Sequence, residues 1–191
     1  MSNSSKTGKN VLKKVITVLL LFFVSYANAY YYNDTVVEIE AKVYPKIIFF
    51  DKDYEKKLVN KTVILAILYE KKDLYIARKM KKFIEKNYGK RILEYPLKVK
   101  MYEYRIFTVD IPATAVIFLS GPKKELIRAA KIAKLKKILS FVYDPLYLKY
   151  GAMISLNIGR DIKPLLNACA VKEAGIRLKA DFVSICKIYK R

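Results

Sequence analysis

The chain has no histidine and no tryptophan, and only two of its 191 residues are cysteines. Without histidine, Ser-His and Cys-His catalytic pairs cannot form, and metal sites that need an imidazole ligand are excluded. Cys169 and Cys186 cannot complete a four-ligand zinc site by themselves. They are candidates for one disulfide in an oxidising compartment, with buried free thiols as the alternative. We expect no metal, no cofactor and no enzymatic activity.

Acidic residues are scarce: the chain has 17 Asp and Glu against 38 Lys and Arg, a formal net charge of +21. Such a surface attracts nucleic acid, anionic lipid head groups or acidic protein faces. Lysine outnumbers arginine 31 to 7 and is spread along the sequence, although arginine is the better bidentate reader of phosphates. The pattern therefore does not favour nucleic-acid binding. General polyanion binding and a weak contact with an anionic membrane surface stay open as alternatives.

An apolar run, Val15–Tyr26, lies near the N-terminus. Four lysines precede it, no acid lies among the first 29 residues, and Ala27-Asn28-Ala29 follows it. A basic start, a short apolar stretch and an A-x-A end are typical of a secretory signal peptide. We expect residues 1–29 to be a cleaved signal peptide. The alternative is a membrane anchor formed by residues 12–29, although a bilayer span needs about 20 apolar residues.

The remaining residues 30–191 have the size of one domain, with 34 basic and 17 acidic residues and a net charge of +17. Strand and helix patterns alternate along them. The expected strands are Thr62–Tyr69, Leu97–Tyr104, Ala113–Leu119 and Ile138–Tyr143, followed by a hairpin of Met153–Asn157 and Ile162–Asn167. The expected helices follow Asn33, cover Asp73–Tyr88, follow Pro122 and end at Ala174 before Gly175. This alternation predicts a single α/β domain with a mostly parallel, Rossmann-like sheet flanked by helices.

Four local features refine this prediction. Pro45 is expected to kink or end the first helix early, and Pro164 restricts the second hairpin arm to a sheet edge or a bulge. The last segment, Lys179–Lys190, has helical spacing that would turn Phe182, Ile185, Cys186 and Tyr189 inward. Asp51 and Asp53 stand among lysines and are expected in solvated loops.

The segment Tyr150–Leu156 resembles the Gly-Gly-Met-Ile segment of YfiR-like periplasmic proteins. An Ile-Asn-Leu element, a glycine and a final Leu-rich helix follow in that family, and Leu166-Asn167-Ala168, Gly175 and Phe182–Ile188 have the same order here. The resemblance therefore depends on Gly151, Met153, Ile154, Asn167 and Gly175. Ala152 replaces the family's second glycine, and the tryptophan expected after the first helix is absent.

The resemblance implies a noncatalytic periplasmic regulator. Such a protein would form a homodimer and bind the periplasmic part of an inner-membrane sensor, typically a diguanylate cyclase. A regulator of this kind shifts its target's equilibrium through a difference in affinity of a few kcal/mol between two states. Tyr30, Tyr31, Tyr32 and Val36 are candidates for the contact surface, because tyrosines are common in interfaces.

A periplasmic small-anion (solute) binding protein is the alternative function. Ligands of open α/β sheets bind outside the carboxyl ends of the strands. Free N–H groups at a helix start attract anions, and here lysines stand beside them. The candidate residues are Lys71, Lys72, Ser120, Gly121, Lys123 and Lys124. An ordinary helix start on a basic surface would give the same pattern.

Overall fold

The structure is a computed structural model that describes residues 32–190. The expected signal peptide, residues 1–29, lies outside the described residues, as do Tyr30 and Tyr31. Helix α2 (Asp34–Ile47) comes first, and β1 (Val63–Tyr69), α3 (Leu74–Tyr88) and the remaining strands follow it. No helix within residues 32–190 is both long enough and apolar enough to cross a membrane.

Among the described residues, eight strands form one sheet in the order β2-β3-β1-β4-β5-β6-β7-β8. The other strands are β2 (Arg91–Ile92), β3 (Tyr95–Glu103), β4 (Ala115–Phe118), β5 (Leu139–Val142), β6 (Ile154–Ile158), β7 (Ile162–Leu166) and β8 (Lys187–Ile188). Pairing is parallel from β3 through β1, β4 and β5 to β6 and again between β7 and β8, and it is antiparallel at β2–β3 and β6–β7. The predicted mostly parallel α/β sheet and its hairpin are confirmed.

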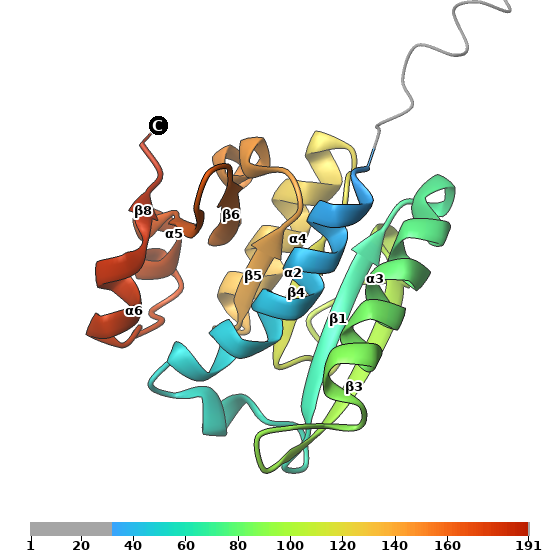
Figure 1. Cartoon of the computed structure of the whole chain (residues 1–191), viewed down its shortest axis with the longest axis horizontal. Coiled ribbons are helices and arrows are strands. Elements are labelled where there is room, and N and C mark those ends of the chain that lie inside the picture. Colours follow the sequence, from blue (N-terminus) through green and yellow to red (C-terminus); the bar gives the residue numbers. More distant parts are fainter. Residues whose placement is uncertain (1–31, 191) are drawn as a thin grey trace, which may run out of the picture. The chain divides into compact units, whose positions relative to one another are not determined.

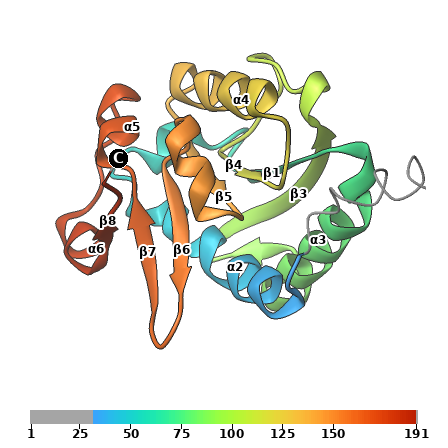
Figure 2. The same ribbon diagram turned by 90° about the horizontal axis from the view of Figure 1, so that it is seen from above.

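Helices cover both faces of this sheet. Figure 2 shows α2 and α3 on one face and α4 (Lys123–Leu135) on the opposite face. The short helices α5 (Ala168–Glu173) and α6 (Ala180–Ile185) lie beside the β7–β8 edge (Figure 1). The strand that follows β1 in the chain, β3, lies on one side of β1, whereas β4 and β5 lie on its other side. The carboxyl ends of β1 and β4 therefore form a topological switch point.

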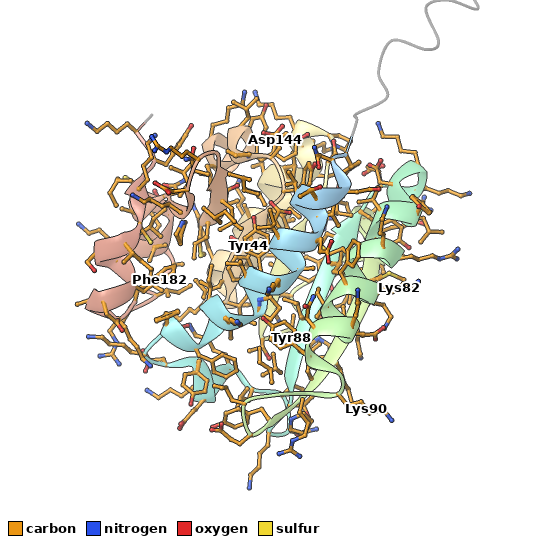
Figure 3. The ribbon with its side chains drawn as sticks, in the orientation of Figure 1. Tyr44, Lys82, Tyr88, Lys90, Asp144 and Phe182 are labelled. Carbon is orange, nitrogen blue, oxygen red and sulfur yellow. The ribbon has the colours of Figure 1, made fainter. Side chains whose placement is uncertain are left out.

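Strand β1 is buried on both faces because every residue from Val63 to Leu68 is apolar. Its Ala66 and Leu68 pack on the α4 side, where the small residues Ala129 and Ala133 let the helix approach closely. On the other face, the Tyr44 ring stacks on Phe141 with the ring centroids 4.6 Å apart. Figure 3 shows Tyr44 and Phe182 directed inward, and Lys82 and Lys90 on the outside.

Helix α2 begins as its sequence predicts. The Asn33 Oδ1 accepts hydrogen bonds from the backbone N–H groups of Thr35 and Val36, at 2.9 Å and 3.3 Å. Pro45 lies inside the helix, which ends two residues later at Ile47 and continues as a 3₁₀ turn. Pro164 lies in β7 opposite Leu156, outside the two residue pairs that join β7 to β8, so its missing N–H leaves no ladder bond unmade.

The prediction for the C-terminal segment was partly wrong. Phe182 is buried and stacks on Phe50, but helix α6 ends at Ile185, and Lys187–Ile188 form the edge strand β8. Ile185 is therefore 58% exposed rather than inward-facing. Helical spacing is weak evidence over so short a segment, and pairing with β7 overrides it.

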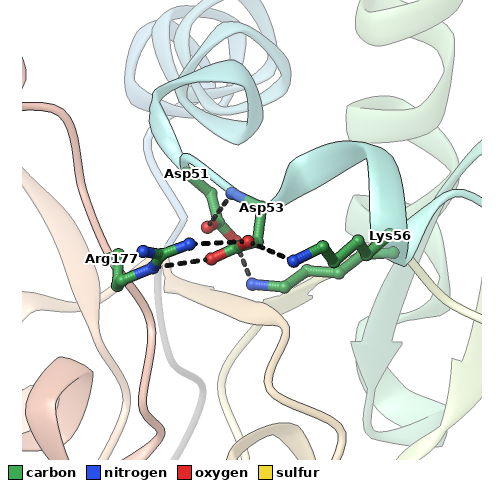
Figure 4. Close-up of polar contacts among 5 residues, drawn as sticks. Asp51, Asp53, Lys56 and Arg177 are labelled. Atoms are coloured by element: carbon green, nitrogen blue, oxygen red, sulfur yellow. Dashed lines mark hydrogen bonds and ion pairs between the residues drawn. The ribbon is translucent and has the colours of Figure 1, made fainter.

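The prediction that Asp51 and Asp53 lie in solvated loops was wrong for Asp51, while Asp53 is partly exposed but bound by ion pairs (Figure 4). Asp51 is buried and forms an ion pair with Lys57. The Asp53 carboxylate accepts two hydrogen bonds from the Arg177 guanidinium, both 2.9 Å long, and one from Lys56. These contacts hold the pKa of Asp53 well below its usual range. They join the loop after α2 to the segment between α5 and α6.

Candidate functional site

The carboxyl ends of β1 and β4 lie side by side at the switch point, and Ser120 lies there directly after β4. Its backbone N–H, however, donates a hydrogen bond of 2.6 Å to the Tyr32 hydroxyl. The Ser120 Oγ lies 2.9 Å from the Tyr147 hydroxyl. Both polar groups of Ser120, its backbone N–H and its hydroxyl, therefore already have partners within the chain.

Tyr32 enters this position from the segment before α2. Its ring is only 8% exposed and packs on Tyr143, with the ring centroids 4.7 Å apart. Burial raises the pKa of its hydroxyl, and the nearby Asp73 carboxylate raises it further, so Tyr32 is a neutral hydrogen-bonding group here. Tyr32 thus lies inside the domain, contrary to its predicted place on a contact surface.

Gly121 has a packing role. A Cβ atom at this position would lie 2.7 Å from Cε2 of Tyr104, which is buried and donates a hydrogen bond of 2.6 Å to the Leu119 carbonyl. Only glycine lets the start of α4 pass so close to this ring. The glycine therefore explains the helix–strand packing and is no sign of a phosphate loop.

The four predicted lysines do not converge on one site. Lys71 lines a pocket at the strand ends, whereas Lys123 lines a different groove along α4. Lys72 and Lys124 are exposed and line neither of these two cavities. The structure thus brings together only part of the predicted set.

The strand-end pocket has a volume of about 340 Å³. It opens where β1, β3 and α4 meet, beside the Tyr104 ring. Its lining residues are Glu70, Lys71, Glu103, Tyr104, Arg105, Pro122 and Glu125. Three carboxylates and two cationic side chains therefore face a space large enough for a small solute.

Two of the three carboxylates have cationic partners. Arg105 pairs with Glu103 at 3.1 Å, and Arg128 pairs with Glu125 at 2.7 Å. Among the described residues, no ion pair joins Glu70. Partial burial raises the pKa of the Glu70 carboxyl, and repulsion from the neighbouring carboxylates, Glu125 first, raises it further. A cationic group bound in the pocket would relieve this repulsion.

Asp73 directly precedes α3 and is close enough to Glu70 to raise the pKa of its carboxyl. Its side chain is 7% exposed, and its Oδ2 has no hydrogen-bond partner among the described residues. Burial raises the pKa of this carboxyl, while Lys72 lowers it. Asp73 and Tyr32 are thus buried polar residues near the strand ends.

Glu70, Glu103 and Glu125 were not among the predicted ligand-binding residues. A signal was present, because Glu70 directly follows the predicted strand Thr62–Tyr69 and Glu103 lies at the end of the predicted strand Leu97–Tyr104. Residues at the carboxyl ends of parallel strands share one edge of the sheet. Because lysines stand beside the same strand ends in the sequence, the predicted ligand was an anion.

The residues that resemble the YfiR-like pattern have structural roles. Gly151 and Gly175 adopt positive φ angles of 99° and 65°, which disfavour other residues. Asn167 is buried and caps α5. Met153 and Ile154 are fully buried, Ile154 at the start of β6.

The two cysteines are free thiols in the structure. Cys169 is exposed on α5, and the partly buried Cys186 follows α6. The Cys186 thiol donates a hydrogen bond of 3.2 Å to the Phe182 carbonyl of its own helix. Burial raises the pKa of this thiol to about 11, which disfavours the reactive thiolate. Within the described residues the two sulfur atoms are not bonded to each other, and the disulfide stays a prediction.

No protein-family model matches the chain, and no curated protein matches its sequence. Solved structures do resemble its fold. A conserved domain protein from Vibrio cholerae matches with a TM-score of 0.53 and 11% identity, over 73% of this chain and 60% of that one. CD0873, a substrate binding protein with adhesive properties from Clostridium difficile, matches with a TM-score of 0.51 and 13% identity, over 72% and 58%. This chain thus spans about three-fifths of their length, and the likeness concerns the fold.

Proposed function

We propose that this chain is a noncatalytic domain that binds a small solute at the carboxyl ends of its parallel strands. The observation that supports this proposal is the pocket lined by Glu70, Glu103 and Glu125 at the topological switch point. Open α/β sheets bind their ligands at such points. The fold likeness to CD0873, which is named a substrate binding protein, agrees with this function.

The charges of the pocket favour a solute with an amine. An ammonium group would pair with Glu70, whose own neighbours repel its charge. Lys71 and Arg105 border the same pocket and would accept an anionic group of the solute. The predicted preference for a small anion therefore gives way, at this pocket, to a cation or a zwitterion.

The proposal predicts that amines stabilise the purified protein from Tyr30 onward. A ligand that binds only the folded state at 100 times its Kd adds about 2.7 kcal/mol to stability. We expect arginine, lysine or putrescine to raise the Tm, whereas succinate and phosphate would have no effect through this pocket. The measurement is thermal unfolding followed by circular dichroism over a concentration series.

Glu70→Gln is expected to abolish the amine-induced shift, and Glu38→Gln is its matched control because Glu38 is exposed on α2. Equal shifts in both variants would contradict the proposed pocket. No shift with any amine at saturating concentration would contradict solute binding of this class.

A separate prediction concerns the hydrogen bond between Tyr32 and Ser120 at the strand ends. Tyr32→Phe removes the hydroxyl that accepts the Ser120 N–H, and an unsatisfied buried donor costs about 1–3 kcal/mol. We expect a matching loss in urea unfolding and faster hydrogen exchange at the Ser120 amide. Tyr75→Phe, at an exposed ring on α3, should change neither. Unchanged exchange at Ser120 would show that the hydroxyl does not bind this amide.

We propose regulation by protein contact, as the YfiR-like resemblance implies, as a second function. A separate observation supports it: Ile162, Ile185 and Ile188 are exposed near the β7–β8 edge. Exposed apolar residues beside an open sheet edge favour contact with another protein. The partner would be the periplasmic part of an inner-membrane protein such as a diguanylate cyclase.

A pull-down from detergent-solubilised membranes at moderate salt tests this second function. The protein from Tyr30 onward should retain a diguanylate cyclase or sensor kinase through a salt wash, and Ile185→Lys should lose it. Lys190→Ala, at an exposed position nearby, is the control. Recovery of nothing but salt-sensitive anionic material would contradict this function.

A further inference from the structure

A second cavity, of about 790 Å³, follows the outer side of α4. Its wall is formed by Lys123, Lys131 and Lys134 of α4, with Lys149 and Tyr150 opposite them. Tyr189 closes it from the C-terminal segment. We call this cavity the basic groove. It lies apart from the strand-end pocket and shares no lining residue with it.

The helical repeat produces the row of lysines. Positions 123, 127, 130, 131 and 134 recur at helical spacing, so they share one side of α4. The rise of 1.5 Å per residue separates the Cα atoms of Lys123 and Lys131 by about 12 Å and those of Lys123 and Lys134 by about 16 Å. Lys149 faces this row from the 3₁₀ segment Pro145–Tyr150.

The groove carries an excess of positive charge. Lys134 pairs with Glu173, which lies on α5. Within residues 32–190, no ion pair joins Lys123, Lys131 or Lys149. The Lys149 ammonium instead lies 5.1 Å from the centroid of the Tyr150 ring. Three cationic groups around one cavity repel one another, and an anion between them would relieve the repulsion.

The floor of the groove is held in place. Gly151 adopts a positive φ of 99°, and a Cβ there would lie 3.5 Å from both the Ala130 Cβ and the Lys134 Nζ. The rings of Tyr150 and Tyr189 are half-buried against the α4-side core. A ligand would therefore meet packed apolar surfaces on one side and lysine ammonium groups on the other.

We propose that the basic groove binds a small, free phosphate compound with at least two phosphate groups. The Cα atoms of Lys123 and Lys131 lie about 12 Å apart along α4, so a ligand with two or more phosphate groups can pair with each lysine near its own position along the groove. A chain of phosphates spans this distance and pairs with each lysine as a point charge. The half-buried tyrosines add an apolar surface for an organic part of the same molecule.

The test is calorimetric titration of the purified protein from Tyr30 onward with inorganic tripolyphosphate at constant ionic strength. We expect Lys131→Glu and Lys149→Glu each to weaken binding at least tenfold, because each reverses a charge at the groove. Lys124→Glu is the matched control: it lies on the first turn of α4, is exposed and does not line the groove, so it should change binding less than twofold.

Both groove variants change exposed side chains, so thermal unfolding should show an intact fold. Equal weakening by Lys124→Glu and Lys131→Glu would overturn the proposal, since it would indicate general attraction to surface charge. Glu70→Gln should bind tripolyphosphate as the unmodified protein does, which separates this site from the strand-end pocket.

A lipid head group offers similar phosphate chemistry, so vesicles form a second arm of the test. Vesicles of phosphatidylglycerol and of phosphatidylcholine are sedimented with the protein. Tripolyphosphate binding that depends on Lys131 and Lys149 supports the proposal. Sedimentation with phosphatidylglycerol without any response to tripolyphosphate would overturn it in favour of a membrane surface.

Discussion

Replacing Asn167 by alanine is expected to destabilise the protein by about 3–5 kcal/mol. The Asn167 side chain is only 4% exposed and satisfies three backbone groups. Its Nδ2 donates to the carbonyls of Leu148 and Ala152 at 2.9 Å and 3.1 Å, and its Oδ1 accepts from the Ala170 N–H at 3.1 Å. Alanine removes this partner from all three; the Leu148 carbonyl keeps the Gly151 N–H at 3.1 Å, whereas each buried group left unsatisfied costs about 1–3 kcal/mol.

Urea unfolding followed by circular dichroism measures this loss, because the chain has no tryptophan to report on it. Asn157→Ala is the matched control, since Asn157 is exposed on β6 and its loss should cost under about 0.5 kcal/mol. A loss below 1 kcal/mol for Asn167→Ala would show that water replaces the amide at these positions.

This prediction bears on the resemblance to YfiR-like proteins. Asn167 joins the turn before β6 to the start of α5, and Gly151 and Gly175 supply the positive φ angles around it. These residues maintain the architecture of the hairpin region. A sequence pattern built on them therefore indicates a shared fold more directly than a shared partner.

The sheet could be predicted because its strongest signals are local. Val63–Leu68 is an uninterrupted apolar run, and only burial on both faces accommodates such a strand. The spacing of Leu126, Ala129 and Ala133 likewise indicated the inward side of α4. The strands β2 and β8 were not predicted, because a strand of two residues is too short to show an alternation of apolar and polar residues.

The candidate site was less predictable because its contacts span long stretches of sequence. The Ser120 N–H bonds with Tyr32, 88 positions earlier, and nothing in the local pattern around either residue indicates this pair. Similarly, Lys123 and Lys149 share a groove only because α4 packs beside the Pro145–Tyr150 segment. The sequence shows which residue types stand at the strand ends, but it does not show which residues they contact.

The second large effect is expected at Glu40, a carboxyl with 0% exposure on α2. The Tyr44 hydroxyl lies 2.9 Å from Glu40 Oε1 and 2.8 Å from the Val142 carbonyl oxygen. The Tyr44 hydroxyl has one proton to donate to these two acceptors, and the Val142 carbonyl also accepts from the Ser155 hydroxyl, at 3.0 Å. Burial raises the pKa of the Glu40 carboxyl well above 4.5; the hydrogen bond from Tyr44 lowers it, and the nearby Asp144 raises it further. Because burial dominates, the folded chain keeps the Glu40 proton above pH 4.5.

The sign of the pH dependence follows from this protonation. Above pH 4.5 the unfolded chain loses the Glu40 proton while the folded chain keeps it, so stability falls as pH rises toward the folded pKa. The loss approaches about 1.4 kcal/mol per pH unit within that window. Glu40→Gln keeps an oxygen that can accept from Tyr44 and cannot ionise, so its stability should exceed that of the unmodified protein by a margin that grows with pH.

Urea unfolding at a series of pH values between 4 and 8 measures this margin. The difference between the two proteins isolates Glu40, because Glu70 and Asp73, whose pKa values are also raised, contribute equally to both. Glu38→Gln, two residues away and exposed, should run parallel to the unmodified protein throughout. A parallel course for Glu40→Gln as well would mean that Glu40 is ionised in the folded state, and burial would then not raise its pKa as we infer.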